Sequence, residues 1–377
     1  MQLVAYGAQD IYLTGNPQIT FFKVVYRRHT NFAMEAVEQT MNGTVATNGR
    51  TTVTISRNGD LVGQCYLQST TPADEPVNGS ISEINNVEVE IGGQKIDKQY
   101  GHWMEVWAEL TENKAGLAKG TNFQQMSGFG YALDASTAMT LNNTAAANAN
   151  VVAHQDMDAC IVWVPLQFWF CRNPGLALPL IALQYHEVKL IFNFGSVGHE
   201  GHKVWCDYIY LDTDERRRFA QVSHEYLIEQ VQDISVSAST SSQSVDLTFN
   251  HPVKELVWAG GLNSGLLTPF AGSASETVLL KLNGHDRFAA REARYFSRAQ
   301  VWQHHSGEGG FVDMSIGVYS FALKPEEHQP SGTCNFSRID NAQLVFSGGF
   351  ENAGTVYAVN YNVLRVMSGM GGLAYSN

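Results

Sequence analysis

Short runs in which apolar and polar residues alternate recur along the chain. Examples are "TTVTIS" around Val53 and Ile55, "VEVEIGG" from Val87, and "TVLLKLNG" from Thr277. A period of two places side chains on one face of a strand, so these runs predict half-buried β strands. "IGGQKI" and "LNGHDRF" put Gly-Gly or Asn-Gly directly after such a run, which predicts tight hairpins. Helical spacing is scarce, and residues 100–110 are the best short candidate.

The chain repeats itself weakly. "EIGGQKI" matches "KLNGHDRF" with Gly93 on Gly284, an offset of 191, and "YHEVKLIF" matches "IDNAQLVF" with Phe192 on Phe346, an offset of 154. The offsets differ by 37, which is close to the length of the segment 111–150. We therefore interpret the chain as two similar β units, the first carrying one long insertion.

The segment 111–150 consists largely of small and amide residues and ends in "TAMTLNNTAAANANVV". It has too few large apolar side chains to form a core of its own. We interpret it as a long surface loop; a disordered linker with a domain boundary near residue 130 is the alternative.

Proline-rich corners, "RNPGLALPLIALQY" and "LKPEEHQPSGTCNFSRID", precede the last strands of each unit and indicate connections between strands.

Composition supports this interpretation. The 377 residues favour two domains, and 34 glycines, 11% aromatics and only 16% charged residues suit strands and tight turns. The predicted fold is all-β. Two β units with about eight short strands each fit two tandem eight-stranded jelly-roll sandwiches with short helices in loops only, although composition alone does not separate jelly rolls from other sandwiches and also allows one large barrel. The expected parts are an arm (1–30), a first jelly roll (31–212), a connector (213–230) and a second jelly roll (231–377).

The balance of charges and cysteines limits the partners. A net charge of −12 disfavours direct binding of nucleic acid. Five cysteines without a C-x-x-C pair predict free thiols in a reducing compartment. The first residues show no signal-peptide pattern, and the strongest apolar run, 161–171, is too short to span a bilayer, so we expect a soluble protein that is not secreted.

Four long blocks resemble one known family. They are "LVAYGAQDIYLTGNPQITFFKVVYRRHTNFA", "VPLQFWFCRNPGLALPLIALQYHEVKL", "YLDTDERRRFAQVSHEYLIEQVQ" and "YSFALKPEEHQPSGTCNFSRIDNAQL". They are distributed over the whole chain, and they resemble the double jelly-roll major capsid proteins of nucleocytoplasmic large DNA viruses.

The resemblance implies a structural protein without catalysis or cofactor. Three copies would form a trimer of pseudo-hexagonal outline, and such capsomers would tile an icosahedral shell. It further implies minor capsid and penton proteins as partners, an internal viral membrane nearby, a place in the virion, and assembly in the host cytoplasm.

The apolar and cationic stretch near the N-terminus would then lie beneath the capsomer. Its aromatic residues would be buried against a neighbour or a minor capsid protein, and its cations would pair with acidic partners or lie near the membrane. The residues of this assembly arm are Phe21, Phe22, Lys23, Tyr26, Arg27 and Arg28. The alternative is that Ile19–Tyr26 is an ordinary strand of the first jelly roll.

Two other sites carry functional hypotheses. Arg216, Arg217 and Arg218 follow three acidic residues, so a solvated connector is the default, and a role in fixing the two rolls against each other is the alternative. Asn142 begins an N-x-T triplet in the presumed outer loop, which makes it a possible glycan attachment site.

Enzymatic and metal-binding interpretations find little support. "GHEGHKVWCD" gathers potential zinc ligands but lacks the helical H-E-x-x-H spacing, so a polar turn between strands is favoured. A bicupin metalloenzyme needs H-x-H, whereas His304 and His305 are adjacent and would point to opposite faces of a strand. A carbohydrate-binding tandem sandwich is the other rival. We expect no metal, no cofactor and no catalytic residue.

Overall fold

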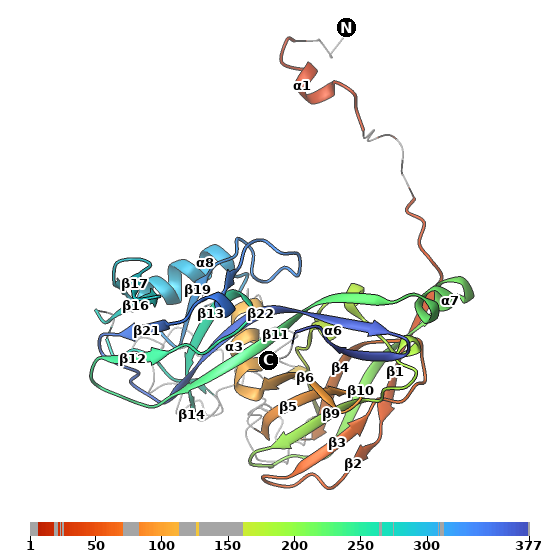
Figure 1. Ribbon diagram of the computed structural model, residues 1–377, viewed down its shortest axis with the longest axis horizontal. Coiled ribbons are helices and arrows are strands. Elements are labelled where there is room, and N and C mark those ends of the chain that lie inside the picture. The colour runs from red at the N-terminus through yellow and green to blue at the C-terminus, as the bar shows by residue number, and fades with distance from the viewer. Residues whose placement is uncertain are drawn as a thin grey trace.

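The computed structural model describes residues 7–18, 22, 24, 26–70, 83–112, 126–127, 161–263, 266–273, 275–307, 309 and 313–375. The chain folds into two β sandwiches that lie side by side, and an N-terminal arm projects away from them (Figure 1).

The first sandwich contains two antiparallel five-stranded sheets. One has the order β1-β10-β4-β7, with β8 paired to β4, and the other has the order β2-β3-β9-β5-β6. Their bounds are β1 Phe32–Gln39, β2 Met41–Asn42, β3 Arg50–Thr54, β4 Leu61–Thr70, β5 Ile84–Ile91, β6 Gln94–Tyr100, β7 Ile161–Pro165, β8 Leu178–Pro179, β9 Val188–Phe194 and β10 Glu200–Leu211. Without the two-residue strands β2 and β8, the described part of this sandwich has eight strands, which is the number that the sequence predicts.

The second sandwich has the same plan. Its six-stranded sheet has the order β11-β22-β13-β19, with β20 on β13 and β23 on β22; its five-stranded sheet has the order β12-β21-β16-β17, with β18 on β16. A separate pair, β14 with β15, stands beside them. The bounds are β11 His224–Val236, β12 Gln243–Asp246, β13 Pro252–Gly260, β14 Leu262–Asn263, β15 Leu266–Leu267, β16 Thr277–Leu282, β17 His285–Asp286, β18 Arg291–Glu292, β19 Ile316–Ser320, β20 Cys334–Asn335, β21 Ala342–Phe346, β22 Gly354–Met367 and β23 Met370–Leu373.

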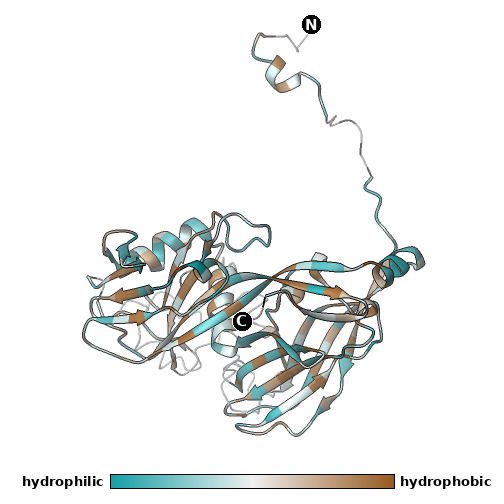
Figure 2. Cartoon of the chain, viewed as in Figure 1, coloured by the Kyte–Doolittle hydropathy of each residue, from teal (hydrophilic) through white to brown (hydrophobic). Residues whose placement is uncertain are grey.

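The alternating pattern of the sequence decides which side chains enter the cores. Along β16 buried and half-buried residues alternate, and β4 does the same from Cys65 onward. Apolar residues therefore line the space between the two sheets of each sandwich. Figure 2 shows the hydrophobic and hydrophilic bands that follow one another along the strands.

Strand pairing confirms the internal repeat. Val87 pairs with Phe192, and Val278, which lies 191 residues after Val87, pairs with Phe346. Gly93 and Gly284 occupy the matching hairpins, with φ of +85° and +77°, where a side chain would be strained. The double jelly roll predicted from the repeat is thus the observed fold.

The described part of the chain has few helices; the first precedes β1 in the N-terminal arm, and the others lie in connections between strands. The helices are α1 Ile11–Thr14, α3 Gly101–Thr111, α6 Trp169–Arg172, α7 Thr213–Gln221 and α8 Gln300–His304, with the short 3-10 turns η2 Pro174–Leu176, η3 Leu180–Ala182 and η5 Phe336–Arg338 and the π-helical turn η4 Tyr295–Ala299. The sequence predicted a helix at 100–110, and α3 confirms it. No helix in the described part of the chain is both long and apolar enough to cross a membrane.

Helix α3 joins the sandwiches. Met104 and Ala108 enter the core of the first sandwich, whereas Trp103 and Trp107 pack on the sheet β11-β22-β13-β19 of the second. Both pairs have the four-residue spacing of one helical face, so α3 presents two apolar faces to two different sandwiches. The sequence predicted the helix but gave no sign that it would be buried between sandwiches.

A long ribbon formed by β11 and β22 also crosses between the sandwiches (Figure 1). Ile228 of β11 and Leu364 and Val366 of β22 belong to the core cluster of the first sandwich, although they come from the second half of the chain. The expected connector, 213–230, folds as α7 followed by the first part of β11.

Candidate functional site

The N-terminal arm carries apolar side chains that no other described part of the chain covers. Tyr12 and Leu13 of α1 are 88% and 84% exposed, and Phe22 and Tyr26 are 99% and 85% exposed. Burying such side chains is favourable, so the arm is a natural contact surface for another molecule. Figure 1 shows it extending far beyond the body of the first sandwich.

The arm residues are only partly described. Arg27 and Arg28 are exposed beside Tyr26, while Phe21 and Lys23 lie outside the described residues. Phe22, Val24 and residues 26–30 are not in a strand, and β1 begins only at Phe32. The described residues therefore favour an arm over the alternative strand, and a role for this arm in assembly stays a prediction.

The arginines of the connector are carried by α7. Asp212 caps this helix by accepting a hydrogen bond from the backbone N–H of Thr213 (2.8 Å). Arg216 Nε lies 2.8 Å from Oδ1 of the buried Asp60 carboxylate, which also accepts the backbone N–H of Leu211. Arg216 therefore holds α7 on the first sandwich.

Arg217 and Arg218 point elsewhere. Both are exposed, while Phe219 on the same helix packs against Leu61 and Ile209 of the first sandwich. Among the described residues, neither arginine forms an ion pair with the second sandwich, so their proposed role in fixing the two rolls stays a prediction.

A buried ionic cluster links the two sandwiches, and the sequence gave no signal for it. Glu229 of β11 accepts from Lys254 of β13 (Nζ–Oε1 2.8 Å) and pairs with Arg172 of α6 (Nη2–Oε2 3.0 Å). His328 Nδ1 lies 3.3 Å from the same carboxylate. Burial alone would raise the pKa of Glu229, but Arg172, His328 and Lys254 outweigh it and lower the pKa to about 2.

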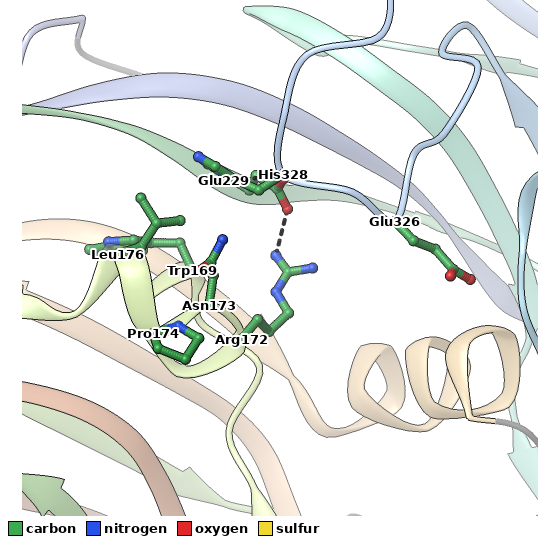
Figure 3. A pocket seen from close by; sticks show the side chains of 8 residues that line it. All are labelled: Trp169, Arg172, Asn173, Pro174, Leu176, Glu229, Glu326 and His328. Atoms are coloured by element: carbon green, nitrogen blue, oxygen red, sulfur yellow. Dashed lines mark hydrogen bonds and ion pairs between the residues drawn. The ribbon is translucent and has the colours of Figure 1, made fainter. Parts of the chain in front are cut away.

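A small cavity of about 200 Å³ opens beside this cluster (Figure 3). Figure 3 shows the Arg172 guanidinium directed at Glu229, with Glu326 on the far side of the cavity. The Arg172 guanidinium also stacks over the Trp107 ring, 4.9 Å from its centroid. The charged groups at this cavity are engaged with one another, which is the arrangement of a structural joint.

A second buried group lies nearby. His305 is held between Glu255 (Nε2–Oε2 2.9 Å) and Glu326 (Nδ1–Oε1 3.1 Å). Burial would lower the pKa of His305, but the two carboxylates outweigh it and raise the pKa to about 9. The sequence interpretation placed His304 and His305 on opposite faces of a strand; this is wrong, because His304 ends α8 and His305 follows it.

Helix α3 also makes a polar contact across the joint. His102 Nδ1 lies 2.7 Å from the Tyr357 hydroxyl, and its Nε2 lies 2.8 Å from the carbonyl oxygen of Gly260. A carbonyl only accepts, so Nε2–H donates to it and Nδ1 accepts from the hydroxyl, which is the neutral imidazole. Burial lowers the pKa of His102 and favours this neutral form.

Two of the possible zinc ligands of "GHEGHKVWCD", His199 and His202, are held by side-chain hydrogen bonds. Glu83 accepts from the backbone N–H groups of Gly198 and His199 and pairs with His202 (Nε2–Oε2 2.9 Å). Residues 195–199 form a turn between β9 and β10, but the prediction of a turn for the whole motif is wrong beyond it, since Glu200 and His202 already belong to β10. Within the described ranges no group of three or more His, Cys, Asp or Glu side chains is placed to hold a metal.

Two predictions fall largely outside the described residues. Asn142 lies in the stretch 128–160, so its role as a glycan attachment site stays a prediction. The long loop 111–150 is described only at residues 111–112 and 126–127.

The fold and these surfaces together define a class of protein. Two jelly rolls are joined by a buried helix and a buried ionic cluster, and an apolar arm is left uncovered. Such a molecule acts through its outer surfaces, and the class is that of double jelly-roll structural proteins.

Comparisons with known proteins show the family. Residues 20–212 match the model of the major capsid protein N-terminus, and residues 215–372 match the model of the large eukaryotic DNA virus major capsid protein. This chain belongs to the family of major capsid proteins of large eukaryotic DNA viruses. The similar proteins and the fold are those of structural capsid proteins, not of enzymes, and this chain is a capsid component of the virion.

Individual relatives cover the whole chain. The major capsid protein of Pyramimonas orientalis virus is 51% identical over 100% of this chain and 99% of its own length. The major capsid protein of Paramecium bursaria Chlorella virus 1 is 41% identical over the same shares. A chain of the quasi-atomic capsid model of PBCV-1 has a TM-score of 0.78 at 36% identity, covering 95% of this chain and 100% of that one.

The fold extends to more distant proteins. The Faustovirus major capsid protein has a TM-score of 0.67 over 96% of this chain and 94% of its own, at 12% identity. At that identity the likeness concerns the fold alone.

Proposed function

We propose that this chain forms homotrimeric capsomers of pseudo-hexagonal outline that tile an icosahedral shell. The observation that carries the proposal is the match over 95% of the chain to a subunit of the PBCV-1 capsid model. The internal repeat supports it, because three copies of a molecule with two similar sandwiches place six similar units around a three-fold axis.

The contacts within the trimer are expected to be permanent. A standard protein interface buries about 1,600 Å², and obligate assemblies bury about 2,000 to 5,000 Å² with a more apolar surface. Association within a trimer should therefore outlast association between neighbouring trimers. The function of the chain is to bury lateral surface between capsomers.

Light scattering on the purified full chain tests the trimer. The expected mass is three times 41.5 kDa, and electron micrographs should show particles of hexagonal outline. A monomer at micromolar concentration would overturn the proposal, and monomers that bind a glycan column would favour the tandem carbohydrate-binding alternative.

The arm is proposed to face the interior of the shell. Exposed apolar side chains of α1 and Tyr26 would be buried there against minor capsid or penton proteins, and Arg27 and Arg28 would pair with acidic partners or lie near an internal membrane. Assembly would take place in the host cytoplasm.

Limited trypsin digestion tests the arm. Isolated trimers should be cleaved at Arg27 or Arg28, since these residues are exposed, whereas the same bonds should resist in intact virions. Equal cleavage in both would overturn an interior, buried arm and leave the trimer proposal standing.

A further inference from the structure

Helix α8 and the turn η4 before it present an unusual outer face. Trp302 is 83% exposed, and the side chains of Arg298 and Arg294 are 61% and 46% exposed. Both arginines bind the same carboxylate oxygen of Asp313, at 3.1 and 3.2 Å, so they lie on one side of the segment. Trp302 follows Arg298 by four residues, which is the spacing of neighbours on a helix surface.

The opposite side of this segment is packed against its own sandwich. Phe296 belongs to the core of the second sandwich, and Val301 is buried with residues of β13, β19 and β22. The inner side of the segment is therefore buried, whereas Trp302 on its outer side is exposed to solvent. Scattered exposed apolar residues are common, but a nearly free tryptophan next to two arginines is the composition of an interface.

Helix α3 occupies the corresponding position in the first sandwich. It lies between β6 and β7, whereas η4 and α8 lie between β18 and β19, and β7 and β19 have the same place in their sheets. Unlike α8, α3 is covered on both sides. Its outer tryptophans, Trp103 and Trp107, pack on the sheet β11-β22-β13-β19 of the neighbouring sandwich.

The receiving surface for α3 has a defined register. Trp103 meets Tyr357 of β22, with ring centroids 4.9 Å apart. Tyr357 pairs with Val257 of β13, and Val257 in turn pairs with Val318 of β19. This row of side chains forms the outer face of the sheet at the point where the helix docks.

The first sandwich has a corresponding row of side chains on the outer face of its sheet β1-β10-β4-β7. Trp205 of β10 pairs with Tyr66 of β4, and Tyr66 lies 191 residues before Val257, the offset of the internal repeat. Their chain neighbours Cys65, Leu67 and Cys206 are in the core, so Tyr66 and Trp205 point to the outer face. Both are half-buried aromatic residues on a sheet face that is normally polar.

The charges on the two surfaces are complementary. Asp207 lies two residues after Trp205 on the same face of β10, and Glu38 of β1 pairs directly with Trp205. Glu38 already pairs with Lys203 of the same face (Nζ–Oε2 3.1 Å), so Asp207 is the carboxylate offered to a partner. The two arginines near Trp302 share the single carboxylate of Asp313, which leaves one positive charge in excess there. Opposite charges of this kind select one partner surface and one register.

We propose that Trp302 of one copy packs on Tyr66 and Trp205 of a second copy of this chain, repeating between molecules the contact that α3 makes within one. This inference deepens the trimer proposed above and rests on it. A contact between two different surfaces closes into a ring when the rotation allows, and α8 and β10 lie on different sandwiches (Figure 1). Each trimer would then contain six similar contacts between a helix and a sheet. Three would lie within a chain, through α3, and three between chains, through α8.

Truncation of the anchor is the first test. Trp302→Ala should raise the dissociation constant of the trimer roughly 30-fold or more, the factor expected for loss of a hot-spot side chain. Light scattering over a dilution series measures it, and far-UV circular dichroism checks that the fold is unchanged. The matched control is Tyr185→Ala, since Tyr185 is 75% exposed on the first sandwich and should leave the mass unchanged.

A charge exchange tests the partner surface. Arg298→Glu should weaken the trimer, and Arg298→Glu combined with Asp207→Arg should restore it, because the exchanged charges attract again. Restoration supports the pairing, and two additive losses contradict it.

A photo-crosslink identifies the receiving strands. Benzoylphenylalanine placed at position 302 should link to peptides containing Tyr66 or Trp205 of another copy. Links to any other segment overturn the inference. If the wild type is a trimer and the Trp302→Ala variant dissociates no more readily, this contact alone is rejected. If the wild type is a monomer, the trimer proposal itself is rejected.

Discussion

Arg172 of α6 and Glu229 of β11 form an ion pair across the joint between the sandwiches, with Nη2 and Oε2 3.0 Å apart. Glu229 also binds Lys254, whose side chain is 1% exposed. One carboxylate thus pairs with two cations from different parts of the chain. The proposed capsomer requires two sandwiches that keep a fixed mutual orientation, and this joint supplies directional contacts that a purely apolar interface would lack.

Replacing Glu229 should destabilise the protein strongly. Glu229→Gln keeps the shape but removes the counter-charge of the buried Lys254 and of the half-buried Arg172, which costs about 3 to 5 kcal/mol of unfolding free energy. Urea unfolding followed by tryptophan fluorescence measures the loss. The control is Glu225→Gln, since Glu225 and Arg365 form an exposed pair whose loss should cost less than about 1 kcal/mol. Equal losses would contradict a structural role for the cluster.

Acid should weaken the same joint. The pKa of Glu229 is lowered from 4.5 to about 2 in the folded protein, so its contribution is fully present above pH 4.5 and is lost as the pH falls towards 2. The difference corresponds to about 3 kcal/mol. Thermal unfolding of the wild type between pH 5 and pH 3 should show a steep loss, and the Glu229→Gln variant should show a shallower one. Parallel curves would argue against this assignment.

Alkaline pH should act through His305. Glu255 and Glu326 raise its pKa from 6.5 to about 9 against the effect of burial, so its contribution is fully present below pH 6.5 and is lost as the pH rises through 9. The melting temperature of the wild type should fall over that range. His305→Gln should be less stable at pH 6 and should lose less between pH 6.5 and 9. A variant as sensitive to alkali as the wild type would refute the prediction.

Helix α3 should be the principal apolar anchor of the joint. Trp103 is 1% exposed and Trp107 5% exposed, and either substitution to alanine should cost about 3 to 5 kcal/mol. Because these side chains hold the second sandwich, calorimetry of Trp103→Ala should show two separated transitions in place of one. Tyr12→Ala, in the exposed α1, is the control and should change neither the number of transitions nor the melting temperature.

The connector arginines should differ from one another. Arg216 binds the buried Asp60 but is itself 60% exposed, so Arg216→Ala should cost at most about 1 kcal/mol and lower the melting temperature by a few degrees or less. Arg217→Ala should leave trimer yield and melting temperature unchanged, and that result would discard a role for Arg217 in fixing the two rolls. A larger effect of Arg217→Ala than of Arg216→Ala would revive it.

The sequence by itself determined the two β units. Alternation along residues such as Val87 and Val278 fixes which face of a strand is apolar, and a one-residue shift would turn every side chain to the wrong face. Residues that the repeat aligns occupy equivalent places in the sheets, because Phe192 pairs with Val87 and Phe346 pairs with Val278. Glycines at positions that need positive φ fixed the matching hairpins.

Only the tertiary structure decided how the two units are joined. Glu229, Lys254, Arg172 and His305 are ordinary polar residues in the sequence, since nothing local marks a charge whose partner lies far along the chain. Trp103 and Trp302 look alike as aromatic residues on short helices, yet one is buried against a second sandwich and the other stands exposed. The sequence sets the faces of each element, but which face meets which is a property of the packed chain and of the copies around it.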